Sequence, residues 1–321
     1  MKRNEFFKLA MSAGLSAKLA LAREAVEKPV TAAGPLPRRP LGKTGEKVSI
    51  IGFGGNVVKN EEQDVVRKVV AEAIEAGVNY FDNSPRYGNT EVKLGPVLEP
   101  FRRKIFLACK TGIRDAAGAR LELEHSLELF RTDHFDLYQL HYLHSREDIE
   151  QAFGPGGAME TLVKARQEGL ARFLGFSAHT VEAAQAAMER FDFDTIMFPF
   201  NYVAWYKGNF GSQIVEKAAA EDMGILAIKP GASCRRVGDT DRRFPKCWYV
   251  PLVDEEDAAL SYYFTLSLPV SSAFPPGEVE LFRLALKVAR SFIPLSESEK
   301  AELARQAASL PPLFEYPAWK S

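Results

Sequence analysis

Four residues near the ends of short apolar segments could together deliver a proton to a carbonyl oxygen. They are Asp82, Tyr87, Lys110 and His141. A free tyrosine titrates near ~10, and a neighbouring ammonium group would stabilise its phenolate and lower that pKa. We therefore predict that Tyr87 exchanges the proton with help from Lys110. Asp82 would keep the ammonium charged, and His141 would orient the substrate oxygen.

Each of these residues also has a purely structural interpretation. Asp82 could be a turn residue, Lys110 a solvated strand end and His141 a polar group at the rim of a sheet. The chemical interpretation is favoured because three ionisable residues end three consecutive apolar runs. Parallel strands in a closed barrel bring such ends to one place.

The elements that would position these residues are short strands alternating with helical patterns. The predicted strands are 49–53, 78–81, 104–109, 136–141, 171–176, 195–198, 224–229 and 269–273. Strands that are apolar throughout are typical of parallel sheets covered on both faces. Eight such units in roughly 250 residues indicate a (β/α)8 TIM barrel. A doubly wound open sheet is disfavoured, because the first turn reads GFGGN and lacks the G-x-G-x-x-G spacing.

Further segments decorate this barrel. A β-hairpin centred on residues 43–45 would cap it at the N-terminal side, and the first helix would begin with Asn60 as its cap. The connection 231–254 is far longer than usual, so it could be a lid over a ligand or a surface loop. Ser296 and Glu299 form a capping box that predicts a C-terminal helix, followed by an aromatic tail.

Composition limits the classes of partner. The chain has 321 residues, a net charge of −1 and 46% hydrophobic residues, which favours neither nucleic acid nor acidic lipid as a partner. Cys109, Cys234 and Cys247 show no metal-ligand spacing, and no metal site is predicted. A Cys234–Cys247 disulfide is an alternative if the protein is exported. A metal-dependent hydrolase has only the proximity of His141 and His144 in its favour.

Residues 1–36 are predicted to be a leader and linker in front of the barrel at 37–321. Positions 1–22 have the basic start, the apolar run and the final ALA of a signal peptide. The order R-x-x-F-F-K resembles the twin-arginine signal RRxFLK, with Asn4 in place of the second arginine. We expect a periplasmic or exported protein if the leader works, and otherwise a cytoplasmic one with the leader attached. No stable membrane span is predicted, because Lys18 interrupts a run that is already short.

Several motifs, in order, resemble the aldo-keto reductase family from about Arg38 to Ala301. They are RPLGKTGEKVSIIGFGG, FDNSPRYGNTEVKLG (family pattern DTAxxYGxxE), KT after the third strand, DLYQLH and GLARFLGFSAH. The family's catalytic Asp, Tyr, Lys and His match Asp82, Tyr87, Lys110 and His141. The resemblance implies a barrel that binds NADPH across its C-terminal mouth. Hydride would pass to the carbonyl carbon while the tyrosine protonates the oxygen.

The resemblance also implies the residues that contact the nucleotide. Ser177 and Asn201 would lie near the nicotinamide carboxamide. The pyrophosphate would lie along Lys229, Pro230, Gly231 and Ser233.

Three departures from the family pattern concern the same nucleotide. Met197 replaces a usual glutamine, and Ile228 replaces a usual aromatic residue. The Lys-Ser pair that binds the 2′-phosphate is replaced by PPGEVE, whose two glutamates would repel a phosphate. Arg283 remains as its candidate partner. NADP is therefore the predicted cofactor, with NAD as an alternative.

The predicted function is the NAD(P)H-dependent reduction of an aldehyde or ketone, which makes the chain an oxidoreductase acting on a small-molecule carbonyl substrate. The alternative is a nucleotide-binding barrel of the same fold with a regulatory role and little turnover. The identity of the carbonyl compound and the oligomeric state are left open by the sequence.

Overall fold

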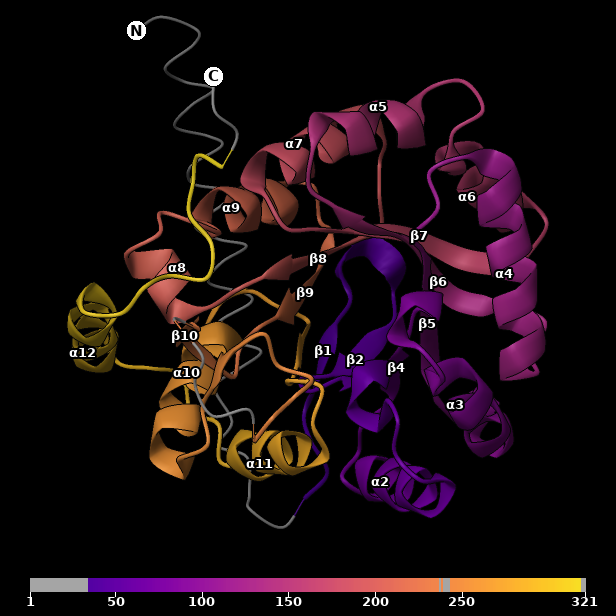
Figure 1. Ribbon diagram of the computed structural model, residues 1–321. Coiled ribbons are helices and arrows are strands. Elements are labelled where there is room, and N and C mark those ends of the chain that lie inside the picture. Colours follow the sequence, from indigo (N-terminus) through magenta and orange to yellow (C-terminus); the bar gives the residue numbers. More distant parts are fainter. Residues whose placement is uncertain (1–33, 237, 239–242, 319–321) are drawn as a thin grey trace, which may run out of the picture.

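The structure, a computed structural model, describes residues 34–236, 238 and 243–318. Its centre is a barrel of eight parallel strands in the order β12-β9-β8-β7-β6-β5-β4-β3 (Figure 1). The bridge between Ile51 and Ala273 joins the first strand region to the last and closes the barrel. The predicted (β/α)8 barrel is therefore confirmed. The barrel strands are β3 (Phe53–Gly54), β4 (Tyr80–Asp82), β5 (Phe106–Thr111), β6 (Phe135–Leu143), β7 (Ala171–Ala178), β8 (Thr195–Pro199), β9 (Gly224–Ile228) and β12 (Ser272–Phe274).

Helices surround the strands in Figure 1, and α12 lies outside this ring beside α8 and α10. The α-helices are α2 (Gln63–Glu75), α3 (Thr90–Leu98), α4 (Ala116–Phe130), α5 (Arg146–Phe153), α6 (Ala158–Gln167), α7 (Val181–Arg190), α8 (Tyr202–Tyr206), α9 (Ser212–Ala220), α10 (Glu255–Ser267), α11 (Val279–Ala289) and α12 (Glu297–Ala308). The 3-10 helices are η1 (Gly42–Thr44), η2 (Gly55–Val58), η3 (Pro85–Tyr87) and η4 (Glu99–Lys104). The predicted capping box at the start of α12 is present, since Ser296 and Glu299 bond each other's backbone.

Two local predictions for the first barrel unit were wrong. The predicted strand 49–53 is divided, because Ser49 ends β2 (Lys47–Ser49) of the hairpin and Phe53 begins β3. Asn60 is not the cap of α2: its backbone has φ 61, and the N-cap is Glu62. An asparagine tolerates this left-handed backbone better than most residues, so its type indicated a turn as well as a cap.

The predicted hairpin is formed by β1 (Arg38–Pro40) and β2, and it covers the N-terminal end of the barrel. The buried Arg39 donates to the backbone oxygens of Val270 and Leu266, which precede β12. Leu41 and Val48 of the hairpin belong to the same apolar cluster as the side chains that fill the barrel interior. The N-terminal end is therefore closed by packing, and any site for a small molecule must lie at the other end.

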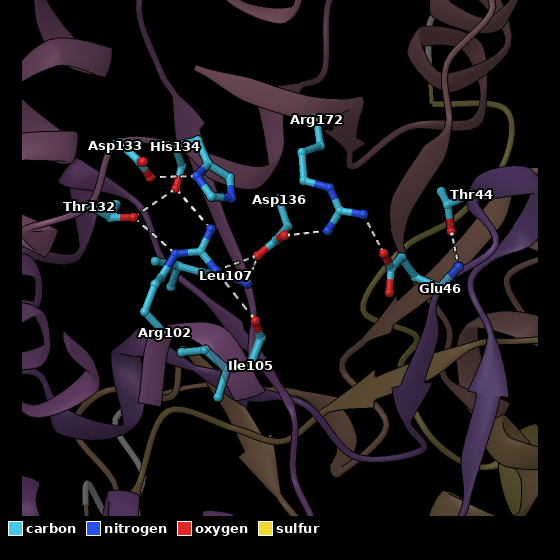
Figure 2. Close-up of polar contacts among 10 residues, drawn as sticks. All are labelled: Thr44, Glu46, Arg102, Ile105, Leu107, Thr132, Asp133, His134, Asp136 and Arg172. Atoms are coloured by element: carbon cyan, nitrogen blue, oxygen red, sulfur yellow. Dashed lines mark hydrogen bonds and ion pairs between the residues drawn. The ribbon is translucent and has the colours of Figure 1, made fainter. Parts of the chain in front are cut away.

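A network of ion pairs fixes the strands at this closed end (Figure 2). The carboxylate of Asp136 is almost fully buried and pairs with Arg102 at 2.8 Å and with Arg172 at 2.6 Å. It also accepts a hydrogen bond from the backbone N–H of Leu107 at 2.8 Å, and Arg172 continues to Glu46 of the hairpin. The network thus links β5, β6, β7 and the hairpin.

At the open end, the long connection after β9 forms a second hairpin of β10 (Ala232–Arg235) and β11 (Tyr249–Pro251). The side chain of Lys246, between these strands, donates to the Glu61 carboxylate at 2.8 Å and to the backbone oxygen of Val57 at 3.0 Å. Its backbone N–H donates to Glu278 at 2.8 Å. The connection is therefore attached to the loops after the first and the eighth barrel strands. Cys234 and Cys247 are free thiols, so the alternative of a disulfide is not met.

None of the described helices is long and apolar enough to cross a membrane. The predicted leader lies outside the described residues, apart from 34–36 at its end.

Candidate active site

The structure brings the four predicted catalytic side chains together at the open end of the barrel. Asp82 ends β4, Lys110 is the next-to-last residue of β5, and His141 is two residues from the end of β6. Tyr87 ends η3, a short helix whose N-cap is Ser84 and whose first residue, Pro85, has a fixed φ that suits that position. This local structure explains how a residue five positions after Asp82 reaches back over the strand ends.

Lys110 is completely buried, and its ammonium contacts the Asp82 carboxylate and the backbone oxygen of Asn83. The second oxygen of Asp82 accepts a hydrogen bond from Gln139 at 3.1 Å. The Lys110 nitrogen lies 5.4 Å from the centre of the Tyr87 ring. Asp82 therefore holds the ammonium at the tyrosine.

His141 lies on the other side of Tyr87, with the ring centres 5.6 Å apart and the two planes nearly perpendicular. Its Nδ1 is 2.9 Å from the hydroxyl oxygen of Ser84. The structure gives Nε2 no hydrogen bond to any residue in its described ranges. That nitrogen is therefore free to contact a bound molecule.

The electrostatics of the site are governed by burial. Burial raises the pKa of Asp82 more than Lys110 lowers it. Burial would lower the pKa of Lys110, but Asp82 and Tyr87 together raise it above its usual value. Removal from water raises the pKa of Tyr87, and the nearby Lys110 offsets only part of this rise. Lys110 therefore lowers the pKa of Tyr87 as predicted, but the net shift is upward because burial outweighs it.

The pKa of His141 is well below its usual value, first because of burial and next because of the positive charge on Lys110. His141 is consequently neutral near pH 7. With a protonated tyrosine, a charged lysine and a neutral histidine around one space, the site can donate protons and stabilise negative charge on an oxygen.

The residues predicted for the nicotinamide end differ in their availability. Ser177 is buried and its hydroxyl oxygen accepts the backbone N–H of Tyr142 at 2.7 Å, which leaves its hydrogen for another partner. The Asn201 amide is largely used: its oxygen caps α8, and its nitrogen donates one of its two hydrogens to the backbone oxygen of Ala232 at 2.5 Å. Met197 faces the apolar interior of the barrel.

Lys229, predicted for the pyrophosphate, ends the seventh barrel unit with a left-handed backbone of φ 70. Its ammonium lies 5.7 Å from the ring centre of Trp248 and 5.3 Å from that of Tyr249. Burial lowers its pKa to about 8. The structure shows no carboxylate paired with this ammonium among the residues it describes, which suits an anionic ligand.

The next three predicted residues follow Lys229 directly. The backbone oxygen of Pro230 accepts the Ser261 hydroxyl at 2.6 Å. Gly231 leaves no room for a side chain, since a Cβ there would lie 2.9 Å from the hydroxyl of Tyr262. Ser233 lines a cavity of about 240 Å³ between α8, α10 and α12.

Arg283, the predicted partner of the 2′-phosphate, is occupied elsewhere. Its guanidinium forms two hydrogen bonds with Glu72 of α2, at 2.8 and 3.0 Å, in the outer helical layer. The two glutamates expected to repel a phosphate are also paired, Glu278 with Lys246 and Glu280 with Arg243.

Several side chains at the site were missed by reading the sequence. Gln139 precedes His141 by two positions on the same strand, a spacing that places both on one face. His179, after β7, has a buried Nδ1 that bonds to no residue within the described ranges, and its ring lies 4.5 Å from that of Tyr142. The Gln139 spacing could have been read in advance, whereas the His179 contact depends on the packing of two strands.

The sequence and the fold were compared with those of known proteins. The sequence profile of the aldo/keto reductase family matches residues 50–249. L-galactose dehydrogenase from Arabidopsis thaliana is 33% identical over 172 residues, which are 47% of this chain and 51% of that protein. The aldo-keto reductase YhdN from Bacillus subtilis is 26% identical over 216 residues, 61% of each chain. The chain thus spans about half the length of the first of these curated relatives.

Among solved structures, the holo form of aldo-keto reductase AKR11C1 from Bacillus halodurans shares the fold. It superposes with a TM-score of 0.68 over 88% of this chain and 99% of that one, at 21% identity. The family profile covers more than half of the sequence, including three of the strands that carry the candidate catalytic residues. The chain belongs to the aldo/keto reductase family.

Proposed function

We propose that this protein reduces an aldehyde or ketone to an alcohol with NADPH, or alternatively with NADH, and that Tyr87 is the general acid. The observation that carries the proposal is the buried contact between Lys110 and Asp82 beside the Tyr87 and His141 rings. An oxidoreductase is the coarser conclusion, which family membership supports independently.

Each residue has one task in this reaction. A bound reduced nicotinamide would supply the hydride to the carbonyl carbon. Tyr87 keeps its proton at neutral pH, because its pKa is raised by removal from water, and gives it to the carbonyl oxygen as negative charge develops there. Lys110 then stabilises the phenolate, and Asp82 holds Lys110 in place. Neutral His141 donates a hydrogen bond to the same oxygen.

The residues present fit a dinucleotide in part. The ammonium of Lys229 suits the pyrophosphate, and the hydroxyl of Ser177 suits the carboxamide. Asn201 has only one amide hydrogen left for a ligand, and Arg283 is bound to Glu72. We propose NADP as the cofactor. Because Arg283 is not free to bind the 2′-phosphate, we expect the protein to discriminate less strongly against NAD.

The second candidate function is a nucleotide-binding barrel with a regulatory role and little turnover. The observation that favours it is the engagement of Asn201 by α8 and by the backbone of β10, which leaves one amide hydrogen of this residue for the nicotinamide end. The complete set of proton-donating residues favours the enzyme.

One experiment separates the two. Fluorescence titration with NADPH and with NADH gives the affinities, and turnover is then measured on a panel of aldehydes, ketones and sugars. The enzyme is expected to bind at least one nucleotide at micromolar concentration and to reduce part of the panel, in the usual range of about 1 to 10³ per second. Binding without turnover on any compound would support the regulatory alternative, and absence of binding would overturn both.

A further inference from the structure

A serine occupies a position of this site where the family pattern has alanine. The pattern DTAxxYG reads Asp82-Asn83-Ser84-Pro85-Arg86-Tyr87-Gly88 in this chain. Ser84 is completely buried between β4 and η3, and its hydroxyl oxygen lies 2.9 Å from Nδ1 of His141. It also accepts the backbone N–H of Arg86 at 3.2 Å, which caps η3. One hydroxyl therefore touches both the histidine and the short helix that carries Tyr87.

The hydrogen of the Ser84 hydroxyl has a single acceptor within reach among the described residues, Nδ1 of His141. A serine hydroxyl is one donor with two acceptor positions. The Arg86 N–H uses one acceptor position, so the donor is left for His141. Among the described residues the structure gives Ser84 no other acceptor. If Nδ1 carried a proton, the hydroxyl hydrogen would be buried without a partner, at a cost of about 1–3 kcal/mol.

The charges around His141 act in the same direction. Lys110 on β5, Arg114 after β5 and Arg86 on η3 each oppose a positive charge on His141, and His179 after β7 would do the same when protonated. Asp82 is the nearby carboxylate, and it is already paired with Lys110 and bonded by Gln139. The imidazole is therefore neutral, and the only remaining question is which nitrogen carries its hydrogen.

We propose that Ser84 is a positioning residue, whose hydroxyl donates to Nδ1 of His141 and thereby keeps the hydrogen of the imidazole on Nε2. Nε2 is the nitrogen left without a bond to the described residues, so it presents its hydrogen to the open mouth. The carbonyl oxygen of a substrate is the acceptor that this hydrogen suits. The contact between Nε2 and a substrate carbonyl rests on the proposed function, whereas the assignment of the hydrogen to Nε2 does not.

The tautomer is measured directly by two-dimensional ¹⁵N–¹H NMR of the full chain labelled at histidine, with the His141 signals assigned from the His141→Gln variant. At pH 7 the wild type is expected to show a protonated Nε2 and an unprotonated Nδ1. Ser84→Ala is expected to lose this single form and populate the other tautomer. Observation of a protonated Nδ1 at His141 in the wild type would overturn the proposal, whatever the protein's activity.

The kinetic test uses the carbonyl compound that the panel identifies. Ser84→Ala is expected to lower kcat/KM by about 5- to 10-fold, the effect of one hydrogen bond of about 1 kcal/mol, with the Kd of the nucleotide unchanged. Ser84→Thr keeps the hydroxyl, and its β-branched side chain suits the extended backbone at this position (φ −161, ψ 144). It is expected to restore the tautomer and most of the rate.

A role confined to capping η3 predicts a different result. In that case Ser84→Ala would lower Tm and kcat/KM equally in the wild-type and His141→Gln backgrounds, with the tautomer unchanged. The proposal requires instead that Ser84→Ala has little effect on kcat/KM once His141 is glutamine. Absence of turnover on every compound would count against the proposed function, while the NMR result would still decide the role of Ser84.

Discussion

Tyr87 is partly buried beside a charged lysine, and its raised pKa means that it holds a proton until negative charge develops next to it. Replacing it by phenylalanine removes the hydroxyl and keeps the ring that packs against His141. We expect Tyr87→Phe to lower kcat by about 10²- to 10⁴-fold, the usual contribution of a positioned acid. Because the ring is kept, the nucleotide Kd should stay within about a factor of two of the wild type in fluorescence titrations, which is roughly 0.4 kcal/mol. Full activity in this variant would reject Tyr87 as the acid.

Lys229 supplies a second test at the level of single residues. Its pKa of about 8 means that the ammonium loses its charge as the pH rises through that value. An anion binds the charged form, so the affinity for NADPH should be greatest below about pH 8 and fall by about tenfold towards pH 10. Lys229→Arg should give a flat profile, because arginine stays charged throughout. An unchanged decline in that variant would assign the pH dependence to another group.

The sequence located the four candidate catalytic residues because each follows or ends an apolar run, and this is a local property. It could not predict the direction of the Tyr87 shift, since the desolvation that decides it comes from tertiary packing. Nor could it predict that Arg283 pairs with Glu72, a residue 211 positions away. The sequence also gave no sign that Asn201 caps α8, a role that occupies its side-chain oxygen.

Among the elements, the barrel strands were predictable and their exact limits were not. Apolar runs of four to six residues that alternate with helical segments are typical of a parallel sheet covered by helices on both faces. The limits predicted for the first strand, 49–53, were wrong because Ser49 pairs with β1 in the hairpin and is not part of the barrel sheet. The hairpin β10–β11 was missed because its strands are separated by a long polar connection, and the pairing is long-range.

Asp136 offers the sharpest test of how the elements are held together. Its carboxylate joins Arg102 from η4, Arg172 from β7 and the backbone of β5 (Figure 2). Asp136→Ala leaves two guanidinium groups and a buried N–H without their partner, and should lower the free energy of unfolding by about 3 kcal/mol in urea. The exposed Asp133→Ala is the matched control, with an expected change below about 0.5 kcal/mol. Equal effects of the two substitutions would show that the network contributes little.

At the scale of the whole molecule, the two ends of the barrel are occupied by different kinds of contact. The closed end is filled by the hairpin β1–β2 and by apolar side chains. At the open end, Trp248 and Tyr249 lie beside Lys229, which follows the seventh barrel strand. Lys246 attaches the connection between β10 and β11 to Glu61 and Glu278, on loops after the first and the last barrel strands. Residues 243–249 are therefore held by these polar contacts and by an apolar cluster that includes Phe244, Cys247 and Tyr249.

This arrangement predicts that Lys246→Gln loosens residues 243–248 while the barrel stays folded. The side chain of Lys246 is largely buried, so its replacement removes the bonds to Glu61 and to the backbone of Val57. We expect faster cleavage within residues 243–248 by thermolysin, which cuts before large apolar residues such as Phe244 and gains no preferred site from glutamine. Urea unfolding should change by less than about 1.5 kcal/mol.

Lys287→Gln is the matched control, since it removes an exposed ion pair with Glu255 on the outer helices and should leave the cleavage rate unchanged. Equal cleavage of both variants would mean that residues 243–248 are held by the packing of Trp248 and Tyr249 and not by Lys246.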